Sequence, residues 1–328
     1  MSEALDTAFG MGMGEGDLRF PSVLDRLIHL RTLPTLGRLA AGGLTYVASH
    51  AVERHFEPGE LVYSPDRPVD AVHFIAEGRV RVEQEGLHIL DGVPPFVIGF
   101  FPVLSQSTTG QRAVAVEPTV TLELARPALL EVFEDDFGFL ENAIRQMSRQ
   151  MVEMQRELEA RGLLERSTPE QTPYPHEPLD LVERLDLMGR DFYADSNIEP
   201  FVQLVRMSQE VRYEPGDLLW ETGDPSSWGL NVAHGVVRCE GEDRVFRVGP
   251  GSSLGYIECY GVLPRSYRAT AETRVVALRQ PGEAFIDVLE DHPKLALSVA
   301  SMMAGFVLGL SLKVAQAQAA APVTDESE

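Results

Sequence analysis

The feature that most constrains this chain is an internal repeat. Residues 56–61 (FEPGEL) match residues 213–218 (YEPGDL), and residues 76–81 (AEGRVR) match residues 233–238 (AHGVVR), both at an offset of about 157 positions. Solenoid repeats are much shorter, about 20–50 residues, so the repeat indicates a duplicated domain. A chain of 328 residues is long enough for two domains, each with its own core.

Each copy contains short runs of β-branched or alternating residues, separated by Pro and Gly turns. In the first copy these runs cover residues 61–63, 71–75, 79–83 and 119–124. Many short strands with regular breaks are typical of a jelly-roll sandwich or barrel. We therefore expect a mainly β protein with flanking helices, in which two tandem jelly-roll barrels are joined by a long helix and a proline-rich linker.

This pattern also predicts the domain boundaries. Residues 1–29 are expected to be a flexible leader, residues 30–165 the first domain with its long C-terminal helix, and residues 166–180 a linker with four prolines. The second domain is expected at residues 181–314, followed by a disordered acidic tail at 315–328. Residues 33–50 have helical spacing, although Pro34 and the Gly42-Gly43 pair are expected to break that helix into short pieces.

The clearest helix is predicted at about residues 136–161. Its apolar residues alternate in steps of four and three, which gives a heptad seam: Leu140, Ile144, Met147, Met151, Met154 and Leu158. Such a seam pairs helices side by side. It predicts either a homodimer contact, which we expect, or packing on the second domain of the same chain.

An uncharged apolar stretch near the end of the chain has two interpretations. Residues 295–312 (LALSVASMMAGFVLGLSL) contain Gly305 and Gly309 at GxxxG spacing and are just long enough to span a membrane. We expect instead a helix that closes the second domain or contacts a partner, and we consider membrane attachment unlikely.

Composition limits the classes of partner. The chain has 28 Lys and Arg against 50 Asp and Glu, a formal net charge of -22 without a local basic patch, so nucleic acid is not an expected partner. The N-terminal residues lack the basic start and apolar run of a secretory signal, which favours a cytoplasmic location. Cys239 and Cys259 are expected to be buried free thiols, and His73, His88 and His234 are isolated, so no metal site is predicted.

Taken together, residues 56–60, 64–70 and 73–82, with 213–217, 221–225 and 231–237 in the second copy, resemble the cyclic nucleotide-binding domain. This is the barrel of bacterial catabolite activators and protein kinase A regulatory subunits. The resemblance covers about residues 30–160 and 182–312. It implies a regulatory, non-enzymatic role, although the helix-turn-helix of the transcriptional relatives is not found in this chain.

The resemblance also implies a phosphate-binding cassette, typically Phe-Gly-Glu-x-Ala/Leu followed about ten residues later by Arg-x-Ala. The family's Glu accepts from the ribose 2′-hydroxyl, and its Arg and backbone N–H groups hold the cyclic phosphate. Both copies depart from this pattern.

In the first copy, IGFFPVLSQSTTGQRA at residues 98–113, Phe100 follows Gly99 where the Glu is expected, and Pro102 removes an N–H donor. Arg112, before Ala113, is the candidate phosphate-binding Arg of this copy.

In the second copy, LGYIECYGVLPRSYRA at residues 254–269, Tyr256 follows Gly255 at the Glu position, and Glu258 lies two residues late. Arg265 has the family's spacing from Gly255, whereas Arg268-Ala269 aligns with Arg112-Ala113; both arginines remain candidates.

Two kinds of function follow from this sequence. The first is a dimeric regulatory or adaptor protein, not an enzyme, that senses a cyclic nucleotide or related anion through the second domain; no cofactor is certain, and cAMP or cGMP is the candidate ligand. The second is a ligand-free assembly module whose barrels are protein-interaction surfaces. In that case we expect Phe100, Phe101, Tyr256 and Tyr260 to fill the former ligand pockets.

Overall fold

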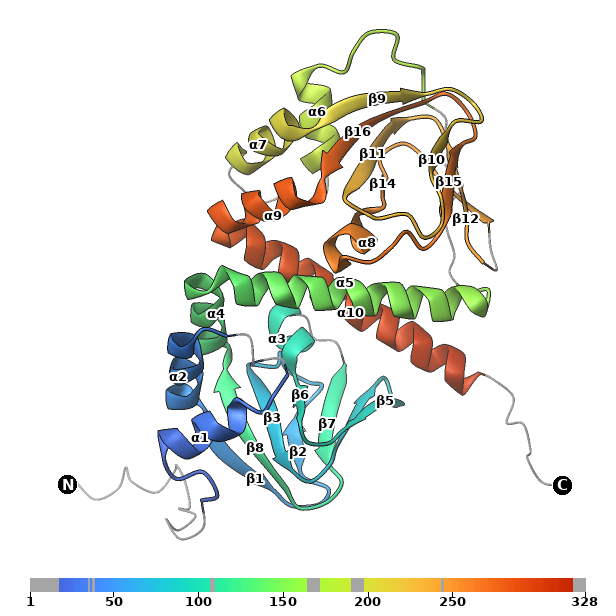
Figure 1. Ribbon diagram of the computed structural model, residues 1–328. Helices are drawn as coiled ribbons and strands as arrows, with labels where there is room; N and C mark the ends of the chain where they lie inside the picture. The colour runs from blue at the N-terminus through green and yellow to red at the C-terminus, as the bar shows by residue number, and fades with distance from the viewer. Residues whose placement is uncertain are drawn as a thin grey trace, which may run out of the picture.

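The computed structural model describes residues 18–34, 36, 39–106, 110–163, 172–189, 198–242 and 245–320. Two β-barrels lie on either side of a pair of long helices that cross between them (Figure 1). Each barrel consists of two four-stranded antiparallel sheets. The predicted class, mainly β with flanking helices and two tandem jelly-roll barrels, is confirmed.

The first barrel contains β1 to β8. One sheet has the strand order β1-β8-β3-β6 and the other has the order β2-β7-β4-β5. The strands are β1 (Val52–Phe56), β2 (Leu61–Tyr63), β3 (Ala71–Glu77), β4 (Val80–Gln84), β5 (Leu87–Gly92), β6 (Phe96–Ile98), β7 (Gln111–Ala115) and β8 (Thr119–Ala125). The four strands expected from the sequence are β2, β3, β4 and β8.

The second barrel repeats this topology strand for strand. Its sheets have the orders β9-β16-β11-β14 and β10-β15-β12-β13. The strands are β9 (Gln209–Tyr213), β10 (Leu218–Trp220), β11 (Trp228–His234), β12 (Val237–Glu240), β13 (Val245–Val248), β14 (Ser253–Leu254), β15 (Arg268–Ala271) and β16 (Val275–Pro281). The pairing registers give each inward-facing residue of one barrel a counterpart in the other.

The helices are also duplicated. In the first half they are α1 (Val23–Leu30), α2 (Ala41–His50), α3 (Phe100–Ser105), α4 (Arg126–Asp135) and α5 (Phe137–Ala160). In the second half they are α6 (Leu181–Gly189), α7 (Glu199–Met207), α8 (Tyr256–Gly261), α9 (Gly282–Asp291) and α10 (Pro293–Ala319). Each half therefore has a short helix inside the barrel sequence, α3 or α8, and ends in a long helix, α5 or α10.

The two long helices are exchanged between the halves. Helix α5, which ends the first half, packs along α8 of the second barrel, and α10, which ends the second half, packs along α3 and β5 of the first. Helices α5 and α10 also pack extensively on each other (Figure 1). One apolar core consequently runs from the first barrel through α5 and α10 to Phe201 and Leu204 of α7 and Leu289 of α9.

The heptad seam lies inside this arrangement. Leu140, Ile144, Met147, Met151 and Leu158 are all buried, and the sulfur of Met154 accepts a hydrogen bond from Ser311 of α10 at 3.4 Å. The chain itself covers these side chains, so the seam is not the homodimer contact that we expected from its spacing. It packs on the second half of the same chain, which was the alternative interpretation.

Several expected boundaries differ from the structure. Residues 23–29, assigned to the flexible leader, are part of α1, which ends at the fully buried Leu30. Ser22 and Asp25 make a reciprocal capping box at the start of this helix. The Gly42-Gly43 pair does not break α2, because the buried residues Leu44, Val47 and Ala48 hold that helix against the core. Helix α10 continues to Ala319, five residues beyond the expected end of the second domain.

The structure describes only part of the expected leader, linker and tail. Residues 1–17, 164–171 and 321–328 lie outside the described residues. The rest of the linker runs along the second barrel, where Arg212 donates hydrogen bonds to the Tyr174 hydroxyl at 3.2 Å and to the Pro175 carbonyl at 2.8 Å.

Helix α10 is, by length and composition, apolar enough to cross a membrane. In the structure one side of this helix packs inside the molecule, where Leu295, Val299, Met303, Val307 and Leu308 are buried, whereas Phe306 is 54% exposed. Its two glycines do not serve close helix packing, because a Cβ added at Gly305 or Gly309 would meet no atom within 4 Å.

This finding predicts that Gly309→Ala stabilises the protein. Alanine is favoured over glycine in a helix interior by about 1 kcal/mol, and the added methyl group has free space. The measurement is the urea-induced unfolding midpoint of the full chain, with Gly305→Ala as a second variant that should behave alike. A lower midpoint for both variants would show that another surface packs closely against this face of α10.

Candidate functional site

The candidate site in each barrel is the turn and short helix that follow β6 or β14. Gly99 begins α3 and Gly255 begins α8, and both adopt a left-handed conformation with φ of 80°. A Cβ at Gly99 would lie 2.8 Å from the Ala71 carbonyl oxygen, and one at Gly255 would collide with the Arg265 guanidinium. Glycine is thus required here both by the backbone conformation and by the lack of space.

Arg265 is held inside the second barrel. Its side chain is 2% exposed, and its guanidinium lies over the Trp220 ring, 4.0 Å from the ring centroid, and 4.9 Å from that of Trp228. One Nη donates to the Gly255 carbonyl at 2.8 Å and the other to the Trp228 carbonyl. Burial lowers the pKa of Arg265. Its hydrogen bonds therefore fasten the start of α8 to β11 (Figure 1).

Tyr256 and Glu258 are held by other parts of the second domain. The Tyr256 hydroxyl accepts from Asn231 Nδ2 at 2.8 Å, and its ring stacks on Tyr260, which stacks on Phe285 of α9. Burial raises the pKa of Tyr256. Glu258 is buried and accepts a hydrogen bond from the Ser266 hydroxyl. Neither side chain supplies the carboxylate that the family uses for the ribose.

The other two candidate arginines lie on the outside of the barrels. Arg112 is exposed and its Nε donates to Glu83 at 2.7 Å, while Arg268 is exposed and its Nε lies 3.5 Å from Glu221. Strand alternation explains this, because the neighbouring Ala113 and Ala269 are fully buried and point inward. Between Arg265 and Arg268, the structure places Arg265 in the barrel interior.

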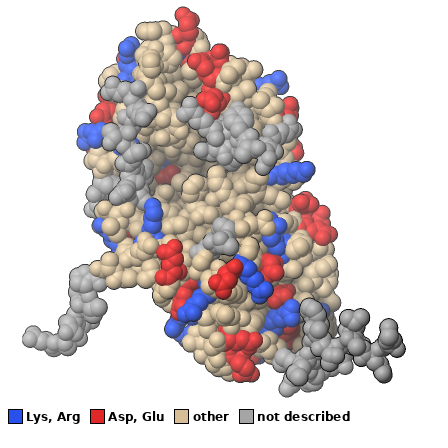
Figure 2. Space-filling model, turned by 180° about the vertical axis from the view of Figure 1, so that it is seen from behind, with Lys and Arg blue, Asp and Glu red and all other residues tan. Residues whose placement is uncertain are grey.

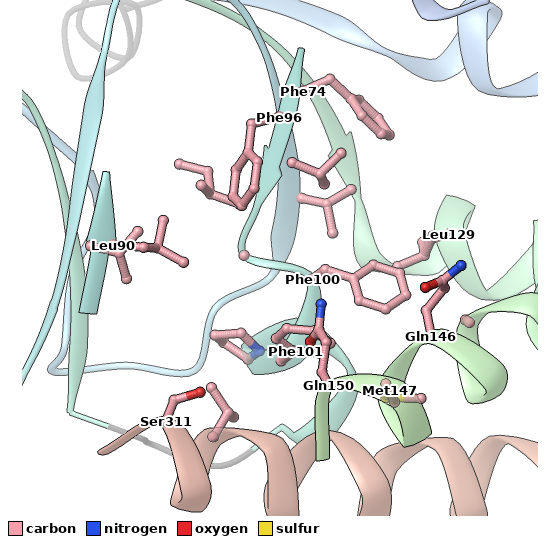
Figure 3. A pocket seen from close by; sticks show the side chains of 18 of the residues that line it. Phe74, Leu90, Phe96, Phe100, Phe101, Leu129, Gln146, Met147, Gln150 and Ser311 are labelled. Carbon is pink, nitrogen blue, oxygen red and sulfur yellow. The ribbon is translucent and has the colours of Figure 1, made fainter. Parts of the chain in front are cut away.

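A cavity of about 440 Å³ opens in the first barrel. Figure 3 shows Phe74, Phe96, Phe100 and Phe101 around it, with Gln146 and Gln150 of α5 and Ser311 of α10 along its other side. Phe100 and Phe101 therefore line this cavity without filling it, contrary to the expectation that they would replace a ligand.

The second barrel interior is occupied by different aromatic residues from those expected. Trp220, Phe246 and Tyr267 pack on one another, with ring centroids 5.8 Å apart for Trp220 and Tyr267 and 5.2 Å for Phe246 and Tyr267. Tyr256 and Tyr260 belong to α8, where Tyr260 stacks on Phe285 of α9 and Tyr256 contacts Asn231 of β11. Sequence reasoning missed the three interior rings, although aligning the two repeats position by position would have found them.

The described residues include no group of three His, Cys, Asp or Glu side chains that could hold a metal ion. Cys239 and Cys259 are buried free thiols, and burial raises the pKa of Cys259. His73 is also buried, lies 3.1 Å from the Thr121 hydroxyl, and has its pKa lowered by burial to about 4.

Because Arg265 joins Gly255 to Trp228, Arg265→Ala should destabilise the second barrel by about 3 kcal/mol, leaving two buried carbonyl groups without this donor. Arg268→Ala, the matched control at an exposed ion pair, should change stability by less than about 0.5 kcal/mol.

Urea unfolding followed by tryptophan fluorescence measures this difference, because both tryptophans of the chain contact Arg265. Equal midpoints for the two variants would contradict a fastening role for Arg265.

On the face seen in Figure 2, Lys and Arg side chains are scattered among acidic ones and do not form a continuous basic area.

Comparison with solved structures gives several similar chains of low identity. The regulatory subunit of a cAMP-independent protein kinase A from Trypanosoma brucei is 17% identical, covers 82% of this chain and 90% of its own, and has a TM-score of 0.34. The regulatory domain of Toxoplasma gondii protein kinase A, solved with cAMP, is 11% identical, with coverage of 84% and 96% and a TM-score of 0.34. The N-terminal domain of a transcriptional regulator from Streptomyces coelicolor is 25% identical, with coverage of 38% and 90% and a TM-score of 0.31.

No curated protein matches the sequence. The family assignment rests on the sequence model of the cyclic nucleotide-binding domain, which matches residues 53–136 and 210–292, together just over half of the chain. These two segments coincide with the two barrels. The chain therefore belongs to the cyclic nucleotide-binding domain family, of which it carries two tandem copies.

Proposed function

We propose that this chain is a non-catalytic regulatory protein in which the state of one barrel controls the other through the exchanged helices. The observation that carries the proposal is the reciprocal packing of α5 on α8 and of α10 on α3. The short helices α3 and α8, which we call the cassette helices, therefore each pack on the long helix that ends the other half. A ligand or partner that shifts one cassette helix must also disturb a helix that belongs to the other barrel.

Specific hydrogen bonds support this coupling. Arg149 Nε of α5 donates to the Gly261 carbonyl at the end of α8, at 2.8 Å, and Arg145 of the same helix reaches the Tyr260 carbonyl at 3.5 Å. On the other side, Ser311 of α10 donates to the sulfur of Met154 in α5. These contacts tie α8, α5 and α10 into one unit.

The first barrel is the receiving half in this proposal, because it holds the cavity. The second barrel is the responding half and presents its surface to a protein partner in the cytoplasm. Its interior residues, Trp220, Phe246 and Tyr267, stabilise it without a ligand. This assignment reverses the expectation from the sequence that the second domain is the sensor.

Coupling predicts that Arg149→Ala loosens both cassette helices. Losing a hydrogen bond worth about 1 kcal/mol should speed amide exchange in α8 about fivefold, and exchange in α3 should also rise because α10 moves with α5. Hydrogen–deuterium exchange of the full chain, read on peptides covering residues 100–105 and 256–261, measures both effects.

Arg156→Ala is the matched control, since Arg156 is an exposed side chain further along the same helix. It should leave both segments unchanged. Faster exchange confined to α8 in the Arg149 variant would mean that the halves are independent, and the regulatory proposal would then be abandoned.

A second candidate function is cyclic nucleotide binding by the second barrel, and the retained Arg265 favours it. Against it stand the two carbonyl groups that already accept from this guanidinium, the absence of the ribose carboxylate at Tyr256, and the ring of Trp220. Calorimetry of the full chain with cAMP, cGMP and cyclic dinucleotides decides between the candidates. We expect no heat of binding; a binding heat that Arg265→Lys abolishes and Arg268→Lys preserves would establish the second candidate.

A further inference from the structure

The cavity of the first barrel is formed almost entirely by apolar side chains. The lining residues come from the strands β2 to β8, from α2, α3 and α4, and from the long helices α5 and α10. Its volume of about 440 Å³ lies within the range of about 300–1,000 Å³ found for small-molecule sites. A void of this size in a barrel core forfeits packing energy, so an occupant that fills it would stabilise the fold.

The strand registers identify three equivalent interior positions at which the two copies carry residues of different size. Tyr63 pairs with Ala113 as Trp220 pairs with Ala269, and Val82 pairs with Leu90 as Cys239 pairs with Phe246. The residue before Arg112 is Gln111, whereas the residue before Arg268 is Tyr267. The three positions that carry Trp, Phe and Tyr in the second barrel therefore carry the smaller Tyr63, Leu90 and Gln111 in the first.

The lining also determines the charge of a suitable occupant. It contains no Lys, Arg or His among the described residues, and its one ionisable carboxylate is Glu153 of α5, an exposed residue. Arg112, the candidate phosphate-binding Arg of this copy, points outward to Glu83. Desolvating a phosphate without a cation costs far more than apolar contact returns, so this cavity does not suit a cyclic nucleotide.

Polar groups are concentrated at one side of the cavity. Gln146 and Gln150 project from α5 towards Phe100 and Phe101 (Figure 3), and both glutamines are solvent-exposed, which places them at the mouth. An amide offers both a donor and an acceptor, so these side chains can bind a hydroxyl or carbonyl group of an otherwise apolar molecule.

We propose that the first barrel binds an uncharged, largely apolar small molecule, with its ring or chain among Phe74, Phe96, Phe100 and Phe101 and one hydroxyl or carbonyl group at Gln146 and Gln150. Leu308 and Ser311 of α10 also line the cavity, so the occupant contacts a helix of the second half. This proposal adds a class of ligand to the regulatory function proposed above. Only the effect of binding on the second half of the chain rests on that function.

The test uses the full chain and the neutral fluorescent probe 6-propionyl-2-(dimethylamino)naphthalene, which combines two fused aromatic rings with one carbonyl group. We expect saturable binding to one site with a blue shift of its emission, and no displacement by millimolar cAMP. Absence of saturable binding, or displacement by cAMP, would overturn the assignment.

Two variants place the probe in the cavity. Leu90→Phe with Gln111→Tyr copies the filling residues of the second barrel and should weaken probe binding by about tenfold or more, because the rings enter empty space. Gln111→Tyr also removes the hydrogen bond that Gln111 Nε2 donates to Gln84 Oε1, so the melting temperature of the double variant is compared with that of Leu90→Phe alone. Leu61→Phe is the matched control, since Leu61 is exposed and does not line the cavity. Should the double variant fail to fold, Tyr63→Trp alone provides the same comparison, and probe binding that neither variant weakens would place the probe outside the cavity.

The probe also separates this inference from the regulatory proposal. Probe binding that slows amide exchange in α10 and α8 supports both. Cavity-dependent binding with changes confined to the first barrel supports the ligand class and contradicts the coupling. Failure of the probe to bind, together with a positive result for Arg149→Ala, contradicts the ligand class alone.

Discussion

The structure depends on the crossing of α5 and α10 between the two barrels. Each of these helices ends one half of the duplicated chain and buries apolar residues against the other half. The first barrel shares one continuous core with both helices, whereas the second barrel also has a separate core between its own sheets. In a tandem duplication, the terminal helix of each domain would ordinarily pack on its own domain, and the interface between the two domains would be small and polar. Here both helices are part of the apolar core that they share with the first barrel.

The two copies have diverged mainly in how they fill their interiors. The second copy has three packed rings and an Arg that fastens its own cassette, whereas the first has smaller residues at the same positions and a cavity lined by phenylalanines. The topology is the same in both copies, and replacement of a few inward-facing residues changes how each interior is packed. Fold and family therefore do not determine the ligand.

The sequence was sufficient to predict the duplication, the barrel class and the long helix at 136–161, because repeats and periodicity report local structure directly. The exchange of helices was not predictable, since the seam at Leu140 to Leu158 specifies an apolar partner without saying which one. The sequence also left both Arg265 and Arg268 as candidates. Strand alternation around the buried Ala269 shows that Arg268 points outward, but it can be applied only once the limits of β15 are known. The cavity depends on how side chains from five or more elements meet, which no local pattern encodes.

The position of α10 in the fold has a consequence for biosynthesis. The surface of α3 that it covers belongs to the first barrel, yet α10 comprises residues 293–319 and follows the whole second barrel in the chain. The apolar face of the first barrel that α10 covers therefore stays exposed while the whole second barrel is translated. A chaperone that shields this face during elongation would protect the nascent chain from aggregation, and a cleavage that removed α10 would leave the first barrel unfinished, even though its own strands were complete.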